Sequence, residues 1–426
     1  MELMPKERAK FARFIERMSA KIRSREYLER SRVSPKDFTR NRKMPFPKLM
    51  FCLLNRVKSS TQNHLENFFE NVTKEDTHMA QQSFSDARQK IRYSAFPELF
   101  ALGVDVIYEG YYDTWHGYRL SAIDGSKMQL PDDQKLRNRF GTMGPDNTAA
   151  TAQASALYDV LNNVLIDVRM VPLRTDERAL ALIHINTLCK RSSFNKECIL
   201  FDRGYASFEL VNTLKGRAIS FVMRVKRGFN KEIDRFSKGD HSVVLKKRGH
   251  DDICVRVLKF DLPSGEVETL ITDIADKTLG VEDFKKLYFK RWPIETKYDE
   301  IKNKLQVENF SGRTVKTVLQ DFYITMIISN AIAVARWEAQ SIVDEQRSAK
   351  DNKYEYHVNT SHAVGVFKDR FIRAMLEPSP RKRAKEVTRI LTLLTYNPAP
   401  TRPDRSVPRN KPPRKAKFRH NRKNNC

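Results

Sequence analysis

The chain has 426 residues, of which 40% are hydrophobic and 31% charged, so it has the length for roughly two to four domains and is not mostly disordered. Its 78 Lys and Arg outweigh 52 Asp and Glu, and this net charge of +26 indicates a polyanionic partner, most often nucleic acid. No secretory pattern opens the sequence, and its longest apolar stretch, residues 322–335, is too short and polar to span a bilayer, so we expect a cytoplasmic protein without a membrane segment.

Positive charge is concentrated at the two ends of the sequence. Residues 1–60 hold 17 Lys or Arg against six Asp or Glu, and residues 397–426 hold ten against one. Residues 399–426 also carry five prolines, which disfavour helix and sheet, so we expect this segment to be a basic disordered tail. We interpret both ends as binding surfaces, although a solvated arm that serves solubility is an alternative for the tail.

The first 115 residues are interpreted as a helical DNA-binding domain. Apolar residues recur at helical spacing at about residues 6–30, 47–55, 61–71, 83 onwards and 95–112. The fourth stretch opens with Ser83-x-x-Asp86, the form of a capping box, and its polar composition is typical of a recognition helix. A plain helical bundle explains the same periodicity equally well.

From residue 119, strands begin to alternate with helices. Strands are predicted at residues 119–124, 151–158, 164–171, 198–202 and 219–224, and helices at 176–190 and 207–215. Three strands followed by alternating helix and strand is the order of an RNase H-like mixed sheet. The sequence therefore predicts an α/β fold, with an RNase H-like catalytic core over residues 116–345.

A β-rich insertion is expected to interrupt this core. Residues 226–268 show short strands separated by Lys, Arg, Gly and Asp turns, and no convincing helix. A long helix is predicted over residues 283–305 and a very apolar one over 315–339. Two amphipathic helices follow in a helical C-terminal region, residues 346–398.

Three acidic residues are candidates for chemistry. Asp124 and Asp202 each end an apolar strand before a glycine-containing turn, and Glu295 lies on the long helix. Ligands collect at strand ends in mixed α/β sheets, and Mg²⁺ binds through a few carboxylates together with substrate phosphate. An Asx turn explains either aspartate taken alone, so a two-metal site is inferred only from the three together.

The five cysteines are far apart without CxxC or CxxH pairs, which excludes a zinc module and a disulfide frame.

The predicted long helix carries four polar residues on one face. Their offsets of 0, 3, 7 and 14 residues place them within about 60° of each other at 100° per residue. The four are Tyr288, Arg291, Glu295 and Lys302. An aromatic ring, two cations and a carboxylate would suit a metal ligand flanked by phosphate-binding groups. A solvated face with an Arg291–Glu295 salt bridge explains the same pattern.

This spacing resembles the Tyr-Arg-Glu-Lys signature of the DDE transposases of bacterial insertion sequences. Ala-Ile-Asp124-Gly-Ser and Leu-Phe-Asp202-Arg-Gly-Tyr resemble the two aspartate blocks of that family, and residues 308–314 resemble the segment after its glutamate helix. The likeness covers about residues 119–335. It is similar to the subgroup whose RNase H-like core carries a β-rich insertion before the catalytic glutamate.

The resemblance implies a role for each candidate residue. The catalytic carboxylates, which would hold two Mg²⁺ ions with Mn²⁺ able to substitute, would be Asp124, Asp202 and Glu295. The residues in contact with DNA phosphates near the cleaved bond would be Tyr288, Arg291 and Lys302. Such enzymes nick by water attack and then use the freed 3′-hydroxyl for attack on the second strand or on target DNA.

The resemblance also implies partners. These are double-stranded DNA, as transposon ends and target, and a second copy of the chain in a homodimer that bridges two transposon ends. Some members cleave through a DNA hairpin and stack a flipped base on a tryptophan of the insertion. Here Trp115, Trp292 and Trp337 lie outside residues 226–268, so Phe221 and Phe229 are the candidates for stacking.

Two other functions stay open. One is a non-catalytic DNA-binding protein derived from such an enzyme, against which the presence of all three carboxylates argues. The other is an RNase H-like nuclease without strand transfer.

Overall fold

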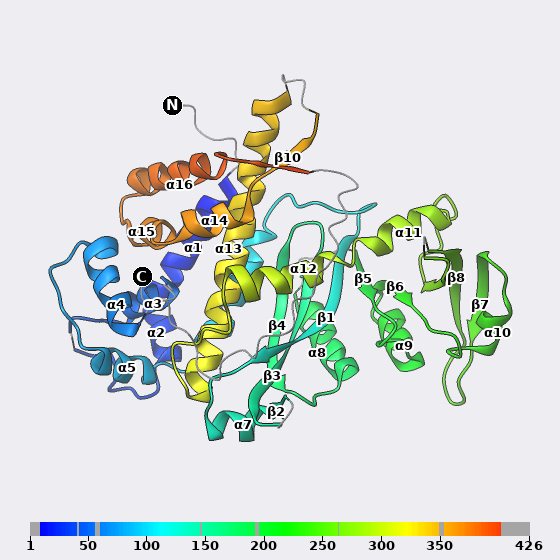
Figure 1. The fold of residues 1–426 in the computed structure, drawn as a ribbon, viewed down its shortest axis with the longest axis horizontal. Helices are drawn as coiled ribbons and strands as arrows, with labels where there is room; N and C mark the ends of the chain where they lie inside the picture. Colours follow the sequence, from blue (N-terminus) through cyan, green and yellow to red (C-terminus); the bar gives the residue numbers. More distant parts are fainter. Residues whose placement is uncertain are drawn as a thin grey trace. The chain divides into compact units, whose positions relative to one another are not determined.

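The computed structural model describes residues 9–40, 42–55, 60–144, 147–191, 196–262, 264–348 and 353–401 (Figure 1). The chain divides into two compact units. The first comprises Met1–Tyr111, Met128–Ala152 and Glu300–Cys426, and the second comprises Tyr112–Lys127 and Gln153–Asp299. The core expected over residues 116–345 is therefore shared between the units, because the apolar helix that begins at Val315 packs against N-terminal helices.

The first unit begins with the expected helical region. Its elements are α1 (Lys10–Arg23), α2 (Arg25–Ser31), α3 (Phe46–Leu54), α4 (Thr61–Asn67), the π-helix η2 (Phe68–Thr73), α5 (Gln81–Gln89) and α6 (Ala95–Ile107). The helix expected over residues 6–30 divides at Ser24, whose hydroxyl accepts the Tyr27 N–H and starts α2. The predicted capping box is wrong, because α5 begins two residues before Ser83 and has no side-chain cap.

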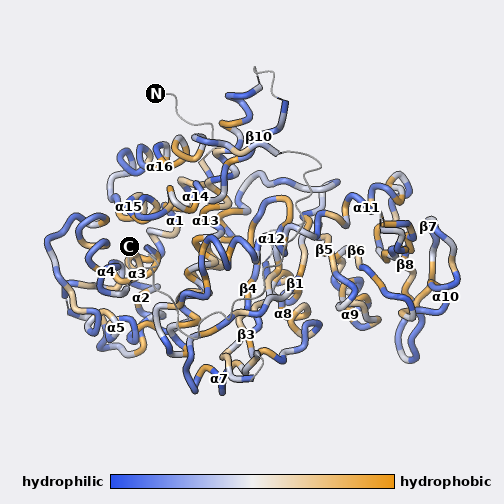
Figure 2. Tube along the Cα trace, in the orientation of Figure 1, coloured by the Kyte–Doolittle hydropathy of each residue, from blue (hydrophilic) through white to orange (hydrophobic). Residues whose placement is uncertain are grey.

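The C-terminal part of the first unit is built around α13 (Val315–Ser348). The other elements are α7 (Gln134–Phe140), η3 (Glu300–Lys304), α14 (Thr360–Phe367), α15 (Arg370–Leu376) and α16 (Pro380–Leu394). Figure 2 shows hydrophilic and hydrophobic turns alternating along α16. Three helices replace the two expected here, because Asp369 has a φ of 64° and separates α14 from α15.

α13 packs against α6 and α1. Phe11 N–H donates to Glu338 Oε1 at 2.7 Å, and Ser19 Oγ donates to Met375 O at 2.7 Å. Over the described ranges, α13 alone has the length and apolar composition to cross a membrane, but most of its apolar window is buried. We therefore interpret it as the core helix of the first unit.

The first unit also contains a short sheet at its C-terminal end. β10 (Glu355–His357) pairs antiparallel with β11 (Ala399–Thr401). The tail expected from residue 399 thus starts with three residues in a strand, and Pro400 is accommodated because an edge strand tolerates a missing N–H. The rest of that predicted tail, residues 402–426, lies outside the described residues.

The second unit contains most of a nine-stranded mixed sheet. Its strands are β1 (Arg119–Gln129), β2 (Thr142–Met143), β3 (Ala149–Asp159), β4 (Val164–Pro172), β5 (Glu197–Phe201), β6 (Ser220–Arg224), β7 (Gly239–Leu245), β8 (Ile253–Asp261) and β9 (Val267–Thr272). Their order is β2-β3-β1-β5-β6-β9-β8-β7, with β4 paired to β3. The helices of this unit are α8 (Glu177–Cys189), α9 (Phe208–Gly216), α10 (Lys231–Arg235), α11 (Val281–Phe289) and α12 (Pro293–Asp299). The expectation of an α/β fold with a large mixed sheet is confirmed.

Residues 226–268 are β-rich, as expected. Their strands extend the main sheet, since β9 pairs antiparallel with both β6 and β8. The expectation of no helix in this segment is wrong, because α10 is capped by Asn230, whose side chain accepts two backbone N–H groups.

The long helix predicted over residues 283–305 is divided into α11, α12 and η3. Pro293 explains the first break, because its ring has no N–H and would clash with the carbonyl four residues earlier in a continuous helix. The argument that four residues share one helical face therefore fails beyond α11. Any proximity among them must come from the turn at residues 290–292.

Candidate active site

Asp124 and Asp202 are brought together by two neighbouring parallel strands. β1 pairs with β5, and the last paired residues are Ala122 and Leu200. Paired strands are about 4.8 Å apart, and each aspartate lies two residues beyond this last pair, so both follow the same end of the β1–β5 ladder. Asp124 does not end its strand as expected, because β1 continues to Gln129, but it lies just beyond the segment paired with β5.

Tyr288 and Arg224 reach Asp202 from two other elements. The Tyr288 hydroxyl, from α11, lies 3.4 Å from Asp202 Oδ1 and 3.5 Å from Phe201 O. Arg224 Nη1, at the end of β6, lies 3.9 Å from the same carboxylate oxygen, while its Nε donates to Glu268. Burial raises the pKa of Tyr288, and Asp202 raises it further, so the hydroxyl stays protonated as a donor.

Arg291 and Glu295 are joined across the turn between α11 and α12. Arg291 Nη2 donates to Glu295 Oε1 at 3.0 Å. Burial raises the pKa of Asp124 to about 6, Glu295 also raises it, and the Gly125 N–H and Arg291 lower it. Asp124, Glu295 and Arg291 are therefore electrostatically coupled, although they belong to a strand and two helical segments.

Arg291 is almost fully buried, with 6% of the residue exposed. Its guanidinium lies 5.3 Å from the ring centroid of Trp292 and 5.9 Å from that of Tyr288. Burial lowers its pKa, but Tyr288 and the three candidate carboxylates together raise it above the ordinary value. Its Nε has no hydrogen-bond partner among the residues that the structure describes. One guanidinium thus interacts electrostatically with all three carboxylates and keeps one donor unsatisfied.

Sequence reasoning missed a fourth carboxylate beside the site. Glu177 lies in the first turn of α8 and is among the causes of the raised pKa of Asp124, after burial and Glu295. A Cβ on Gly125 would lie 3.5 Å from Glu177 Oε1, and one on Gly204 would lie 4.0 Å from Oε2. Both distances are ordinary van der Waals contacts, so the Glu177 carboxylate lies beside the segments that follow the two aspartates. The only signal in the sequence is an acidic helix start, which is common at any helix N-terminus.

A buried polar chain fixes α8 on the sheet. Ser155 Oγ lies 2.9 Å from His184 Nε2, and His184 Nδ1 lies 2.8 Å from Asp167 Oδ2. These residue types match a hydrolase triad, but Ser155 and His184 are fully enclosed, so no substrate reaches the hydroxyl. These hydrogen-bonded side chains instead fix α8 to β3 and β4 and so hold Glu177 near Asp124.

The donor chemistry of the three carboxylates fits a hard divalent cation, because Mg²⁺ prefers carboxylate oxygens. The raised pKa of Asp124, due to burial and then to neighbouring carboxylates, is consistent with clustered acids. In the part of the chain that the structure describes, no group of three or more His, Cys, Asp or Glu is arranged to hold a metal ion. Binding a cation would therefore require the carboxylates to approach each other.

Two of the other sequence-based candidates are not placed in the cluster. Lys302 lies on η3 in the first unit, so its role stays a prediction. Phe221 is fully buried in β6, so the suggestion that it stacks on a base is wrong. Phe229 lies in the turn before α10 and is partly exposed.

Comparisons with known proteins agree with the resemblance. Residues 115–331 match the family model described as "Transposase DDE domain". The chain is 22% identical over 403 residues to "Transposase InsG for insertion sequence element IS4" of Escherichia coli, with 87% of this chain and 86% of that protein covered. It is 29% identical over 142 residues to "Putative transposase InsZ" of Escherichia coli, with 32% and 46% covered. The chain is also similar to a piggyBac transposase in a solved synaptic complex with hairpin DNA, at 10% identity and a TM-score of 0.47, with 89% of this chain and 82% of that chain covered.

Proposed function

Because the chain belongs to the DDE transposase family, we propose that it binds transposon ends, cleaves DNA strands and joins them to target DNA by two-metal phosphoryl transfer. The observation that carries this proposal is the strand register that sets Asp124 beside Asp202, with Glu295 coupled to Asp124. Three carboxylates from two strands and one helix are what such chemistry needs.

Within the family, we place the chain in the subgroup with the Tyr-Arg-Glu-Lys signature. The contacts among Tyr288, Arg291, Glu295 and Asp202 support this assignment. The strand order β4-β3-β1-β5-β6, in which β1, β3 and β4 precede α8 in the chain, supports an RNase H-like core. We take residues 226–268 as the β-rich insertion, because they separate β6 from the glutamate helix.

The carboxylates of Asp124, Asp202 and Glu295 would hold two Mg²⁺ ions, and Mn²⁺ would substitute. When bound, the ions would polarise the scissile phosphate and activate a water or a 3′-hydroxyl. The chain's own groups orient the ligands: the Gly125 N–H donates to Asp124 Oδ1 at 2.8 Å, and the Tyr298 hydroxyl donates to Asp124 O at 2.9 Å.

Three residues would bind DNA phosphate near the cleaved bond, and they are Tyr288, Arg291 and Lys302. Arg291 carries the best support, because it is held over two rings and has an unsatisfied donor. A guanidinium suits this task, since its planar fork can bind a phosphate through two parallel hydrogen bonds.

The partners proposed are double-stranded DNA and a second copy of the chain in the synaptic complex. Residues 1–115 would contain the DNA-binding helices, and the basic tail would add non-specific affinity. We propose a cytoplasmic location, where the chain would meet chromosomal DNA.

The test is strand nicking in Mg²⁺ by the variants Asp124→Asn, Asp202→Asn and Glu295→Gln, on a duplex that contains the end of the element. Each should abolish cleavage while leaving DNA binding intact, because each removes a charge with almost no change in volume. Glu282→Gln, an exposed residue of α11 paired with Lys285, is the matched control and should nick normally. Normal nicking by any carboxylate variant removes that residue from the site. Absence of nicking by the wild type would favour a non-catalytic derivative, and nicking without joining would favour a nuclease.

A further inference from the structure

Several cations of the N-terminal helical region pair with carboxylates. Arg17 pairs with Glu109, Lys21 and Arg30 pair with Glu98, and Lys48 of α3 pairs with Glu75. Four exposed cations elsewhere have no carboxylate partner among the described residues, and they are Lys36, Arg40, Arg42 and Lys90. Three of these four side chains belong to residues 1–60, so part of the excess positive charge of that segment is exposed and unpaired here.

These four cations line one cleft of the first unit. Its volume is about 1080 Å³, and the residues that line it come from two segments, 35–40 with 42–44 on one side and 78–90 on the other. Asp86 is the single acidic residue among those that line it. A concave surface with one sign of charge focuses the electrostatic potential and attracts anions.

Both walls of the cleft are held in place. On one side, Phe38 packs edge-on against Phe46 with ring centroids 5.5 Å apart, and Lys43 Nζ donates to His78 O at 3.1 Å. At the base, Val33 N–H donates to Lys90 O at 2.9 Å. The cations are thus presented by a fixed frame.

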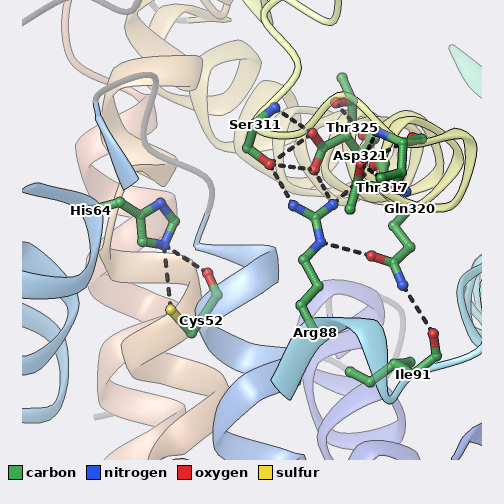
Figure 3. A network of polar contacts seen from close by, with 10 residues as sticks. Cys52, His64, Arg88, Ile91, Ser311, Thr317, Gln320, Asp321 and Thr325 are labelled. Atoms are coloured by element: carbon green, nitrogen blue, oxygen red, sulfur yellow. Dashed lines mark hydrogen bonds and ion pairs between the residues drawn. The ribbon is translucent and has the colours of Figure 1, made fainter. Parts of the chain in front are cut away.

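Arg88 anchors the second wall, which is α5 (Figure 3). Its guanidinium, in a residue only 4% exposed, donates to Gln320 Oε1, Ser311 Oγ, Thr317 O and Asp321 Oδ1 at 2.6–2.9 Å. Because these partners lie on α13 and the segment before it, α5 is locked to the core helix. Its outward side, which includes Gln82, Ser85 and Gln89, stays exposed.

We propose that this cleft binds the sugar-phosphate backbone of double-stranded DNA, with the exposed side of α5 turned towards the bases. The inference rests on the proposed function and names the surface by which the protein would hold its DNA. Unpaired cations supply phosphate contacts, and amide side chains such as Gln82 and Gln89 suit base edges in the major groove. A single strand would require an exposed aromatic platform. Phe38, the one Phe, Tyr or Trp among the described residues that line the cleft, is instead packed against Phe46.

The experiment compares two triple variants of the full-length chain, each with three positive charges removed. The cleft variant is Lys36→Gln/Arg40→Gln/Arg42→Gln. The control is Lys382→Gln/Lys385→Gln/Arg389→Gln, whose side chains are exposed on α16 in the same unit. Binding to a fluorescent 40-base-pair duplex is measured in EDTA over a range of NaCl concentrations, beside a thermal melt of each variant.

The cleft variant should bind DNA at least tenfold more weakly near 0.1 M salt, and its slope of log K against log salt should fall by about 2–3, since each phosphate contact adds about 0.9. The control should keep the wild-type slope. An unchanged slope in the cleft variant, or an equal fall in the control, overturns the proposal. Tighter binding of double-stranded RNA or of a single strand of equal length also overturns it.

The outcome is separable from that of the proposed function. Binding is measured without metal, so it does not depend on the carboxylates. If the cleft variant binds DNA normally while Asp124→Asn loses nicking, the proposed DNA-binding cleft is rejected and the proposed transposase activity is kept. If the cleft variant loses DNA binding while the wild type never nicks, the DNA-binding cleft is kept and the proposed activity is rejected.

Discussion

Removing the Arg88 side chain is expected to destabilise the first unit by about 3–5 kcal/mol. Arg88→Ala deletes all four hydrogen bonds of the guanidinium, to Gln320, Ser311, Thr317 and Asp321. It leaves the Asp321 carboxylate, whose side chain is 3% exposed, without its cation. Ser311 still donates to Asp321 through its N–H and hydroxyl, but neither supplies charge. Breaking a buried ion pair from one side costs about 3–5 kcal/mol, because an uncompensated charge remains.

The same reasoning predicts a partial rescue. Asp321→Asn added to Arg88→Ala removes the stranded charge at constant volume and should recover about 1–2 kcal/mol, whereas Asp321→Asn alone should destabilise. Lys316→Ala is the control, because Lys316 Nζ donates to Gln89 O at an exposed position of the same interface. Its cost should stay within about 0.5 kcal/mol.

Hydrogen exchange of the α13 amides as a function of urea is the suitable assay, since it reports the opening of the first unit separately from the second. Wild type, Arg88→Ala, the double variant and Lys316→Ala would be compared at one pH. A loss below about 1 kcal/mol in Arg88→Ala, or no gain from Asp321→Asn in that background, would refute the account of a buried charge pair.

Three further outcomes are expected. Arg291→Ala should slow Mg²⁺-dependent nicking by about 100-fold with little change in the thermal melt. Arg291→Lys should restore little activity, because the point charge of a lysine cannot reproduce the bidentate fork of a guanidinium. Full activity in Arg291→Ala would mean that Arg291 is only an ion-pair partner of Glu295. Burial raises the pKa of Glu338 to about 7, so this group ionises first in the unfolded chain and stability falls as the pH rises from 4.5 towards 7. Glu338→Gln keeps an acceptor for the Phe11 N–H and should reduce this pH-dependent loss of stability by up to about 3 kcal/mol. The measurement is the urea midpoint at pH 5 and at pH 8, and the difference between the two should be smaller in the variant than in the wild type. Gly312→Ala should cost about 1–3 kcal/mol in a thermal melt, because its Cβ would lie 2.5 Å from Thr317 Oγ1; an unchanged melt would mean that Thr317 moves aside.

Much of the second unit could be predicted from local pattern. The apolar runs before Asp124 and Asp202 correspond to β1 and β5, and the strand register then places both aspartates at one edge of the sheet. The spacing from Tyr288 to Glu295 indicated one site because the residues would share a face of one helix, but the structure divides this segment into α11 and α12. The turn at residues 290–292, just before Pro293 starts α12, brings the side chains together, not one continuous helix.

Long-range contacts were beyond sequence reasoning. Arg88 appears in the sequence as one more cation of a polar helix, because its partners lie 223–233 residues further along. Glu177 appears as an ordinary acidic helix start, and only the packing of α8 on the sheet brings it near Asp124. Periodicity reports which face of an element is buried, but not what it is buried against.

The contacts of α1 with the end of the chain have a consequence for synthesis on the ribosome. The Phe11 N–H can form its hydrogen bond only after Glu338, 327 residues later, has been synthesised. Ser19 likewise needs Met375, 356 residues later. At about 5–20 residues per second, α1 emerges tens of seconds before the helices that cover it. The part of its apolar side that packs on α13 and α15, with Phe11 against Phe371, stays uncovered for that interval, so a nascent chain offers a target for chaperones and proteases. A copy of the gene truncated before α13 would lack the helix that α1 packs on, and its product could not close the first unit at all.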